Sequence, residues 1–361
     1  MAVEVSFRQE DWSRVQRAWA AWWAGDLNRP LVMIEDLEPP PGVHISNIFD
    51  LGPPASSFPL DMPADELLDD YQVGLESKRF YGDAWPKWCP MFGPGIAAGF
   101  LGAQVNTSAD TTWFEPVKEV PIAGLDLAFD PDNAWWQRSQ DLTRRAVARW
   151  GSSVVVGHTD LGGNLDILAS LLSTERLLFD LSDHPEEVER LTGALTQLWL
   201  RYYDELYALI EPADRGTTTW APIWAPGRCY MLQSDFAYMI SPRMFERFVL
   251  PDLVACCRAL DHAFYHLDGA GQIRHLDMLL SLERLHGIQW IPGDGQPPPE
   301  AWLPLLQRIR DAGKLCQLYV SPEGARTIVR ELGGRGFALY IMQPMSQDEA
   351  ERFLRVIQEE A

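Results

Sequence analysis

Basic residues are scarce in this sequence of 361 residues, which holds 30 Lys and Arg against 51 Asp and Glu and has a net charge of −21. Such an excess of negative charge repels nucleic-acid backbones and anionic lipid surfaces. No apolar run approaches the ~20 residues that a membrane-spanning helix needs. The amino-terminal stretch MAVEVSFRQEDW also lacks the basic and apolar regions of a secretory signal. We therefore expect a cytoplasmic protein that binds neither nucleic acid nor membranes.

Cysteine is also rare, and the five cysteines form no CxxC pair. This argues against a disulfide framework and against a closed structural zinc site, and it favours free thiols in a reducing compartment. Neither GxGxxG nor GxxxxGK[ST] follows any expected strand, so nothing indicates a bound nucleotide.

Tryptophan, in contrast, is abundant, with 15 residues in a chain that is 47% hydrophobic and 22% charged. This composition is typical of a globular protein with a large core. The indole rings either fill that core or form the walls of a pocket. Two stretches rich in Gly and Pro, residues 38–63 and 82–102, predict long loops, and loops of this length are often functional.

From residue 135 onward, segments with helical apolar spacing alternate with short apolar runs, which predicts βαβ units and a parallel sheet. Six strands are expected there, at 153–156, 216–220, 262–267, 287–291, 314–320 and 336–342, and two more at 31–35 and 112–117. Eight strands predict a (β/α)₈ TIM barrel, with a doubly wound open sheet as the alternative. We expect a single domain, in which residues 1–80 form an N-terminal helical and irregular extension with the first barrel elements. Residues 81–361 would form the remainder of the barrel.

In a barrel the active site lies at the carboxyl ends of the strands, so polar and aromatic residues there are candidates. His-x-Asp occurs at two such ends, and residues i and i+2 of a strand face the same side. Each pair is able to bind a metal, to act as a carboxylate-oriented general base, or simply to satisfy its own hydrogen bonds. The substrate-binding candidates are His158, Asp160, Trp220, Trp224, Arg228, Trp290, Tyr340 and Gln343, and the second His-x-Asp pair is His266 and Asp268.

Four segments together resemble the uroporphyrinogen decarboxylase superfamily. They are residues 160–170, residues 233–252 with the block Met-Ile-Ser-Pro-Arg-Met-Phe, residues 264–268 with the glycine turn that follows, and residues 287–293. The similarity covers roughly residues 80–345. It implies a (β/α)₈ barrel with the active site at the strand ends.

The resemblance also implies two chemistries. True decarboxylases hold the propionates of a tetrapyrrole with an arginine-rich N-terminal segment. This chain keeps only Arg29-Pro30 of that segment. Asp83 resembles the aspartate with which the decarboxylases bind the pyrrole nitrogens. Thiol methyltransferases of the superfamily hold zinc with His-x-Cys and a later Cys, where this chain has His266-x-Asp268. Other members take methyl groups from donors such as methylated amines, which a Trp-rich pocket would attract through cation–π contacts.

The favoured function is therefore a methyltransferase that moves a methyl group between a small substrate and a separate corrinoid (cobalamin) protein. His266 and Asp268 would position or activate the substrate or hold zinc, and Asp235 would orient them. One alternative is a lyase that decarboxylates a carboxylate smaller than a tetrapyrrole, with Asp83 as proton donor or charge stabiliser. A metal-dependent hydrolase and a barrel that only binds a ligand are the others. A homodimer is compatible with the sequence.

Overall fold

The computed structural model of the chain describes residues 3–41, 52–108 and 111–361. It is an α/β structure around a seven-stranded sheet, in which every neighbouring pair is parallel except β2 and β1. In spatial order the strands are β2 (Lys78–Gly82), β1 (Leu31–Leu37), β13 (Phe337–Ile341), β12 (Leu315–Val320), β11 (Leu285–Ile291), β10 (His262–Asp268) and β9 (Cys229–Leu232). The expected α/β class and the alternation of strands and helices are thus present.

Three small sheets complete the strand inventory of the described residues. β3 (Lys87–Trp88) pairs in parallel with β6 (Val155–Val156), and β7 (Thr217–Thr218) pairs antiparallel with β8 (Trp224–Ala225). The remaining pair is antiparallel, β4 (Gln104–Thr107) with β5 (Thr112–Glu115). The strand expected at 112–117 therefore lies in a separate hairpin and does not join the central sheet.

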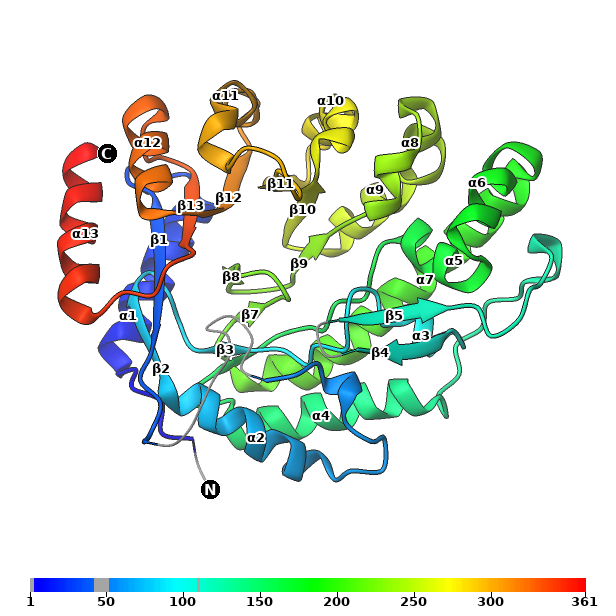
Figure 1. Ribbon diagram of the computed structural model, residues 1–361, viewed down its shortest axis with the longest axis horizontal. Coiled ribbons are helices and arrows are strands. Elements are labelled where there is room, and N and C mark those ends of the chain that lie inside the picture. Colours follow the sequence, from blue (N-terminus) through cyan, green and yellow to red (C-terminus); the bar gives the residue numbers. More distant parts are fainter. Residues whose placement is uncertain (1–2, 42–51, 109–110) are drawn as a thin grey trace.

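The helices lie outside the strands, which follow one another along an arc in Figure 1. Their bounds are α1 (Gln9–Trp23), α2 (Ala64–Ser77), α3 (Ala97–Phe100), α4 (Ala134–Trp150), α5 (Asn164–Leu172), α6 (Thr174–Asp183), α7 (Pro185–Ile210), α8 (Pro242–Phe248), α9 (Leu250–Ala259), α10 (Leu276–Ser281), α11 (Leu303–Asp311), α12 (Pro322–Leu332) and α13 (Gln347–Glu360). Among the described residues, no helix combines the length and the apolar character needed to cross a membrane.

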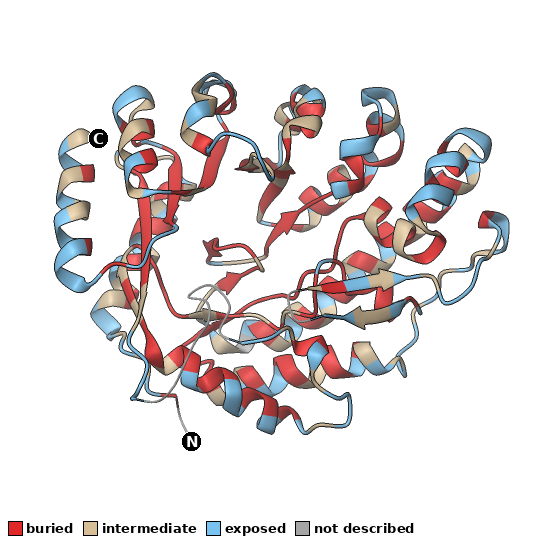
Figure 2. Ribbon diagram, in the orientation of Figure 1, coloured by how far each residue is buried: buried red, intermediate tan, exposed pale blue. Residues whose placement is uncertain are grey.

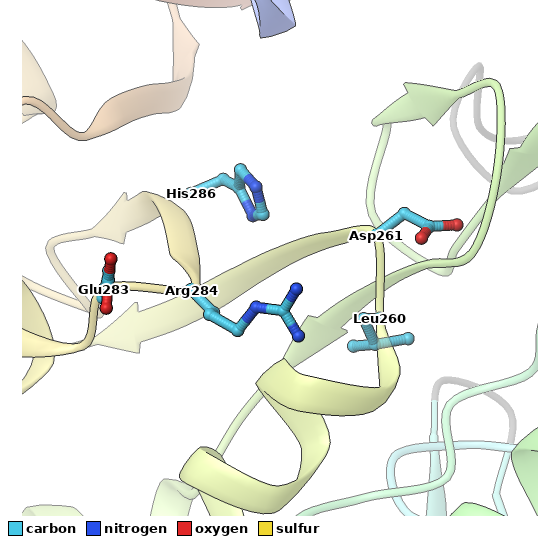
Figure 3. Close-up of a pocket in the computed structure, with 5 residues that line it drawn as sticks. All are labelled: Leu260, Asp261, Glu283, Arg284 and His286. Carbon is cyan, nitrogen blue, oxygen red and sulfur yellow. The ribbon is translucent and has the colours of Figure 1, made fainter.

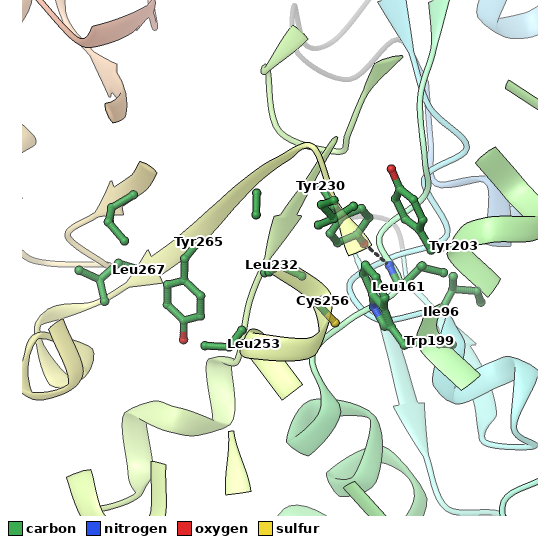
Figure 4. Close-up of a cluster of buried hydrophobic side chains, with 14 of the residues drawn as sticks. Ile96, Leu161, Trp199, Tyr203, Tyr230, Leu232, Leu253, Cys256, Tyr265 and Leu267 are labelled. Atoms are coloured by element: carbon green, nitrogen blue, oxygen red, sulfur yellow. Dashed lines mark hydrogen bonds between the residues drawn. The ribbon is translucent and has the colours of Figure 1, made fainter. Parts of the chain in front are cut away.

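The alternation of side chains along each strand separates two buried clusters. In β10, Ala263, Tyr265 and Leu267 belong to a large outer cluster between the sheet and the helices, whereas Phe264 belongs to a smaller inner cluster. Figure 4 shows part of the outer cluster, including Tyr265 and Leu267. The strands of the central sheet are mostly buried, while the outer helices present exposed faces to solvent (Figure 2). The face of a strand residue therefore decides whether it supports the core or points to the inner side.

Helix α1 fills one end of the inner cluster with tryptophan. Its buried Trp12, Trp19 and Trp22 belong to that cluster, and the ring of Trp22 stacks on Phe264 with centroids 5.8 Å apart. Trp19 meets Trp85 edge to face at 5.0 Å. These large rings occupy the amino-terminal side of the sheet, so the helical spacing of tryptophans in α1 serves packing.

Candidate metal site at the carboxyl end of strand β10

Asp235, His266 and Asp268 come together at one edge of the sheet. Each offers one ligand atom, and these atoms all lie within 4.8 Å of one another. His266 and Asp268 are the fifth and seventh residues of β10, so both point to the inner side, and Asp235 begins the short helix that follows β9. His266 Nε2 lies 3.9 Å from Asp268 Oδ2. Two carboxylates and one imidazole thus converge where two neighbouring parallel strands end.

Two glutamines on the next strands orient the imidazole. His266 Nδ1 is hydrogen-bonded to Gln289 Oε1 of β11, and Gln289 Nε2 donates to Gln317 Oε1 of β12 at 2.5 Å. The register places these three residues in one row across the sheet. An amide oxygen only accepts, so Nδ1 must carry the proton and Nε2 keeps its lone pair for a ligand.

Trp220 packs against this imidazole. Its ring meets His266 edge to face, with centroids 5.1 Å apart. Its indole Nε1 is buried and has no hydrogen-bond partner. Of the three tryptophans that the sequence suggests as candidates, Trp220 is therefore the one that lies at the His266 cluster.

Two further aspartates surround Asp235 from the turn after β6. Asp166, in the first turn of α5, accepts hydrogen bonds from the backbone N–H groups of Asp235 (3.0 Å) and Phe236 (2.7 Å). Asp160 accepts from Gly162 N at 2.8 Å. Asp166 reaches this position because the chain passes close at Gly163, where a Cβ would lie 2.2 Å from the carbonyl oxygen of Gln233.

Three aspartates of this region, Asp160, Asp166 and Asp235, have raised pKa values. Burial, with the charge of Asp235 as a smaller cause, raises the pKa of Asp160 to about 7. Burial, with the charge of Asp235 as the second cause, also raises the pKa of Asp166. Desolvation, with the charge of Asp268 as the second cause, raises the pKa of Asp235. Burial lowers the pKa of His266. Near neutral pH this set therefore combines a neutral imidazole with carboxyl groups that are able to hold a proton.

The donor set fits a divalent metal such as zinc. Zinc accepts imidazole nitrogen and carboxylate oxygen, and a ligating histidine almost always donates its other N–H to a carbonyl or carboxylate, as His266 does to Gln289. In the part of the chain that the structure describes, this is also the only group of three or more His, Cys, Asp or Glu residues with such spacing. Without thiolate, the set is harder than the His-x-Cys site of the zinc thiol methyltransferases.

The other His-x-Asp pair is split between two environments. His158 is buried in the outer cluster, where its ring stacks on Tyr203 with centroids 4.2 Å apart and 3° between the planes. Burial lowers the pKa of His158 to about 3. Asp160 instead turns toward Gln233 and Gly162. Strand β6 ends at Val156, so strand alternation no longer holds at His158, and the two side chains do not share one space.

His158 predicts a measurable acid sensitivity. A folded-state pKa of about 3 lies below the unfolded value of 6.5, so the unfolded chain binds more protons between these values and stability falls as pH falls through this window. We expect His158→Phe, which keeps the stack on Tyr203, to remove about 2 kcal/mol of the stability difference between pH 6.5 and pH 5. Urea unfolding at both pH values measures this difference. His184→Phe at an exposed site is the control, and parallel pH profiles for wild type and His158→Phe would contradict the assignment.

Trp290 and Trp224 do not lie with the His266 cluster. Trp290 is fully buried in the outer cluster and meets Trp302 edge to face at 5.2 Å. Trp224 packs in the inner cluster, and its Nε1 donates to the Arg215 carbonyl at 2.8 Å. Both rings support the fold, which corrects the expectation that they would form pocket walls beside His266.

Asp83 and Arg228 lie at the opposite edge of the sheet. Asp83 pairs with Arg29 through two hydrogen bonds of 2.6 and 2.9 Å and accepts from Val32 N near the amino end of β1. Arg228 immediately precedes β9, with its guanidinium 4.9 and 5.0 Å from the rings of Tyr203 and Tyr207. Because the strands are parallel, this edge is remote from the carboxyl end of β10, and neither residue joins His266.

Tyr340 and Gln343 complete the set expected from the sequence. Tyr340 is buried in β13 on the inner side, with its ring 5.6 Å from that of Tyr319. Gln343 is exposed just beyond β13. Both lie toward the carboxyl end of this strand.

A separate surface pocket lies at the amino ends of β10 and β11. Figure 3 shows it, with Asp261 and His286 on its walls. The other lining residues are Leu260, Glu283 and Arg284. The pocket is on the edge of the sheet opposite to Asp235, His266 and Asp268.

Gln289, Gln317 and Asp166 of this site were not predicted from the sequence. Neither was a separate ion-paired group of Glu35, Lys78 and Lys87. Gln289 and Gln317 are fully buried, and a polar residue in the middle of an apolar strand was the available signal. Glu35 gave the same signal at the end of its apolar strand. Side chains alternate along a strand, so the face of the sheet that each of these residues occupies depends on where its strand begins and ends.

Comparison with known proteins adds no assignment. The chain matches no protein-family model, and no curated protein matches it either.

Proposed function

We propose that this chain is a metal-dependent enzyme of the uroporphyrinogen decarboxylase superfamily that moves a methyl group between a small substrate and a separate corrinoid protein. The observation that carries the proposal is the convergence of Asp235, His266 and Asp268, with Nε2 of the imidazole left available by the hydrogen bond at Nδ1. The resemblance in sequence supports the class of reaction, and the donor set supports the metal.

In this proposal His266, Asp235 and Asp268 hold a zinc ion. When bound, zinc supplies positive charge that favours the deprotonated form of a substrate thiol, hydroxyl or amine. Gln289 fixes the imidazole, and Trp220 covers it and excludes water on that side. Asp160 is placed to hold the proton that the substrate loses, because burial raises its pKa to about 7.

We also propose that the strands close into a (β/α)₈-type barrel. Four contacts beyond the seven-stranded sheet support closure. Lys87 of β3 pairs with Glu35 of β1, Gly157 N donates to Trp88 O at 2.8 Å, His158 N donates to Thr218 O at 3.3 Å, and β7 contacts β9. In such a barrel the metal site would lie at the carboxyl ends of the strands, where barrel enzymes carry their chemistry.

A metal-dependent hydrolase is the second candidate. It is favoured by the protonatable carboxyl groups of Asp160 and Asp166 beside the metal ligands, since metal-assisted hydrolysis needs an acid or base next to an activated water. The lyase alternative loses its proposed proton donor, because Asp83 is paired with Arg29 at the opposite edge of the sheet.

The proposal is tested by metal analysis followed by methyl transfer. We expect purified protein, stripped with a chelator and reloaded, to bind about one zinc per chain, and we expect Asp235→Asn to weaken zinc binding at least about tenfold. Zinc-loaded protein should then demethylate free methylcobalamin in the presence of a thiol or an amine, which the cobalamin absorbance reports. Asp261→Asn, just before the amino end of the neighbouring strand β10, is the matched control.

The outcomes separate the candidates. Zinc binding with hydrolysis of ester or amide substrates, and no change in the cobalamin spectrum with any methyl acceptor, would favour the hydrolase. Failure of wild-type protein to bind zinc, cobalt or manganese would overturn the metal site itself.

A further inference from the structure

One carboxylate on the inner side of the sheet serves two ammonium groups, and only one of these is accessible. Glu35 Oε2 lies 2.6 Å from Lys78 Nζ, and Glu35 Oε1 pairs with Lys87 Nζ. The side chains of Glu35 and Lys78 are 1% and 3% exposed, whereas that of Lys87 is 19% exposed. Lys87 is therefore the member of this group that a ligand is able to reach.

The ammonium group of Lys87 is held on the inner side. It lies 5.3 Å from the ring centroid of Trp85 and 5.2 Å from that of Tyr340, and both rings belong to the inner cluster. His266 faces the same side, two residues beyond Phe264 of that cluster. The ammonium group of Lys87, which reaches Glu35 of β1 from β3, and the metal-site imidazole on β10 therefore face the same inner side.

The inner side also holds a buried hydrogen-bond donor that lacks an acceptor, the side-chain amide of Gln317. Gln317 accepts from Gln289 through Oε1, while its Nε2 is buried and has no partner. Gln317 pairs with Ala338, two residues before Tyr340 on the same face of β13. The ammonium group of Lys87 has three N–H groups, and one of them donates a hydrogen bond to Glu35. Buried donors without acceptors are costly in a folded protein unless a ligand or water meets them.

We propose that Lys87 and Gln317 bind the carboxylate group of a small substrate on the inner side of the sheet. A carboxylate has two acceptor oxygens, which match an ammonium and an amide donor, and hydrogen bonds to charged groups are the stronger kind. A phosphate, as a dianion, would bring a second negative charge toward Glu35 and the aspartates around His266. The inference deepens the proposed function by assigning a carboxylate to its substrate, and it rests on that function only in calling the ligand a substrate.

The test measures binding of simple carboxylates by isothermal titration calorimetry to both chelator-treated and zinc-loaded protein. The probes are butyrate and succinate, with butyramide as the neutral analogue and inorganic phosphate as the competing anion. We expect Lys87→Met to weaken carboxylate binding at least about tenfold and Lys87→Arg to weaken it less than about threefold, because Arg keeps the charge. Lys87→Met leaves Glu35 paired with Lys78, so its melting temperature should stay within about 4 °C of wild type.

Gln317→Leu provides an independent variant, since it removes the unpaired donor and should weaken succinate binding about fivefold without changing butyramide binding. Equal carboxylate affinity in wild type and Lys87→Met would overturn the inference. So would binding of phosphate without binding of either carboxylate, or no carboxylate binding below about 20 mM. Lys87-dependent carboxylate binding in protein that fails to bind zinc would leave this inference standing and reject the metal site.

Discussion

Replacement of His266 by alanine is expected to lower the zinc affinity at least about 100-fold while leaving the melting temperature within about 4 °C of wild type. The imidazole supplies the only nitrogen ligand of the cluster, and His266 stands at a strand end, where its contacts are Gln289, Trp220 and the neighbouring carboxylates. Removing the imidazole should therefore weaken zinc binding strongly while it lowers the stability of the fold only slightly. Calorimetric zinc titration and thermal unfolding of the same samples measure the two quantities.

His286→Ala is the matched control for this prediction. His286 lies near the amino end of β11, with its ring 5.6 Å from that of His262, so these two histidines are the other place where zinc would bind adventitiously. We expect His286→Ala to retain wild-type zinc affinity. Loss of affinity in His286→Ala together with retention in His266→Ala would move the metal to the opposite edge of the sheet and reject the proposed site. Gln289→Leu should fall between wild type and His266→Ala, at roughly 10- to 100-fold weaker binding, because it only releases the imidazole.

Glu35→Gln is expected to lower the free energy of unfolding by roughly 3–5 kcal/mol at pH 7, the usual cost of removing one partner from a buried ion pair. The carboxylate of Glu35 is shared by two lysines, and Lys78 keeps its positive charge in a site that is 3% exposed. Urea unfolding measures the effect. Glu189→Gln, which removes an exposed partner of Arg247, is the control and should cost far less stability than Glu35→Gln.

The contribution of Glu35 should also depend on pH. The two lysines hold the pKa of Glu35 at about 2, below its ordinary value of 4.5, even though burial acts in the opposite direction. The unfolded chain therefore binds more protons between these values, and the contribution is complete above pH 4.5 and is lost as pH falls toward 2. Glu35→Gln should accordingly show a shallower loss of stability over this range. A cost at pH 7 similar to that of Glu189→Gln would contradict the assignment of a buried ion pair.

The strands that could be predicted from the sequence are those long enough to show an apolar run. β10, β11, β12 and β13 each have five to seven residues and lie close to their expected positions. β9 was missed because it has only four residues, Cys-Tyr-Met-Leu, after an irregular Pro-Gly-Arg stretch. β3 has two residues inside a loop rich in glycine and proline, and only pairing with β6 defines it as a strand.

The candidate site was predictable where it depended on local spacing. His266 and Asp268 share a face because β10 continues through both of them. The same reasoning failed for His158 and Asp160, because β6 ends before them and the backbone turns. Gln289 and Gln317 reach His266 only through the register of three strands, and Asp166 reaches Asp235 only through the close approach at Gly163. Such contacts between distant segments leave no periodic signal in the sequence.

The tryptophans of α1 affect how small molecules enter and leave the inner side of the sheet. Trp12, Trp19 and Trp22 fill the amino-terminal side of the inner cluster, where Trp19 and Trp22 leave less than 2% of their surface exposed. In the proposed barrel, a molecule would reach the inner side over the carboxyl edge and would leave by the same route. A bound product would then occupy the route of the next substrate, so we expect competitive inhibition by product in the proposed enzyme.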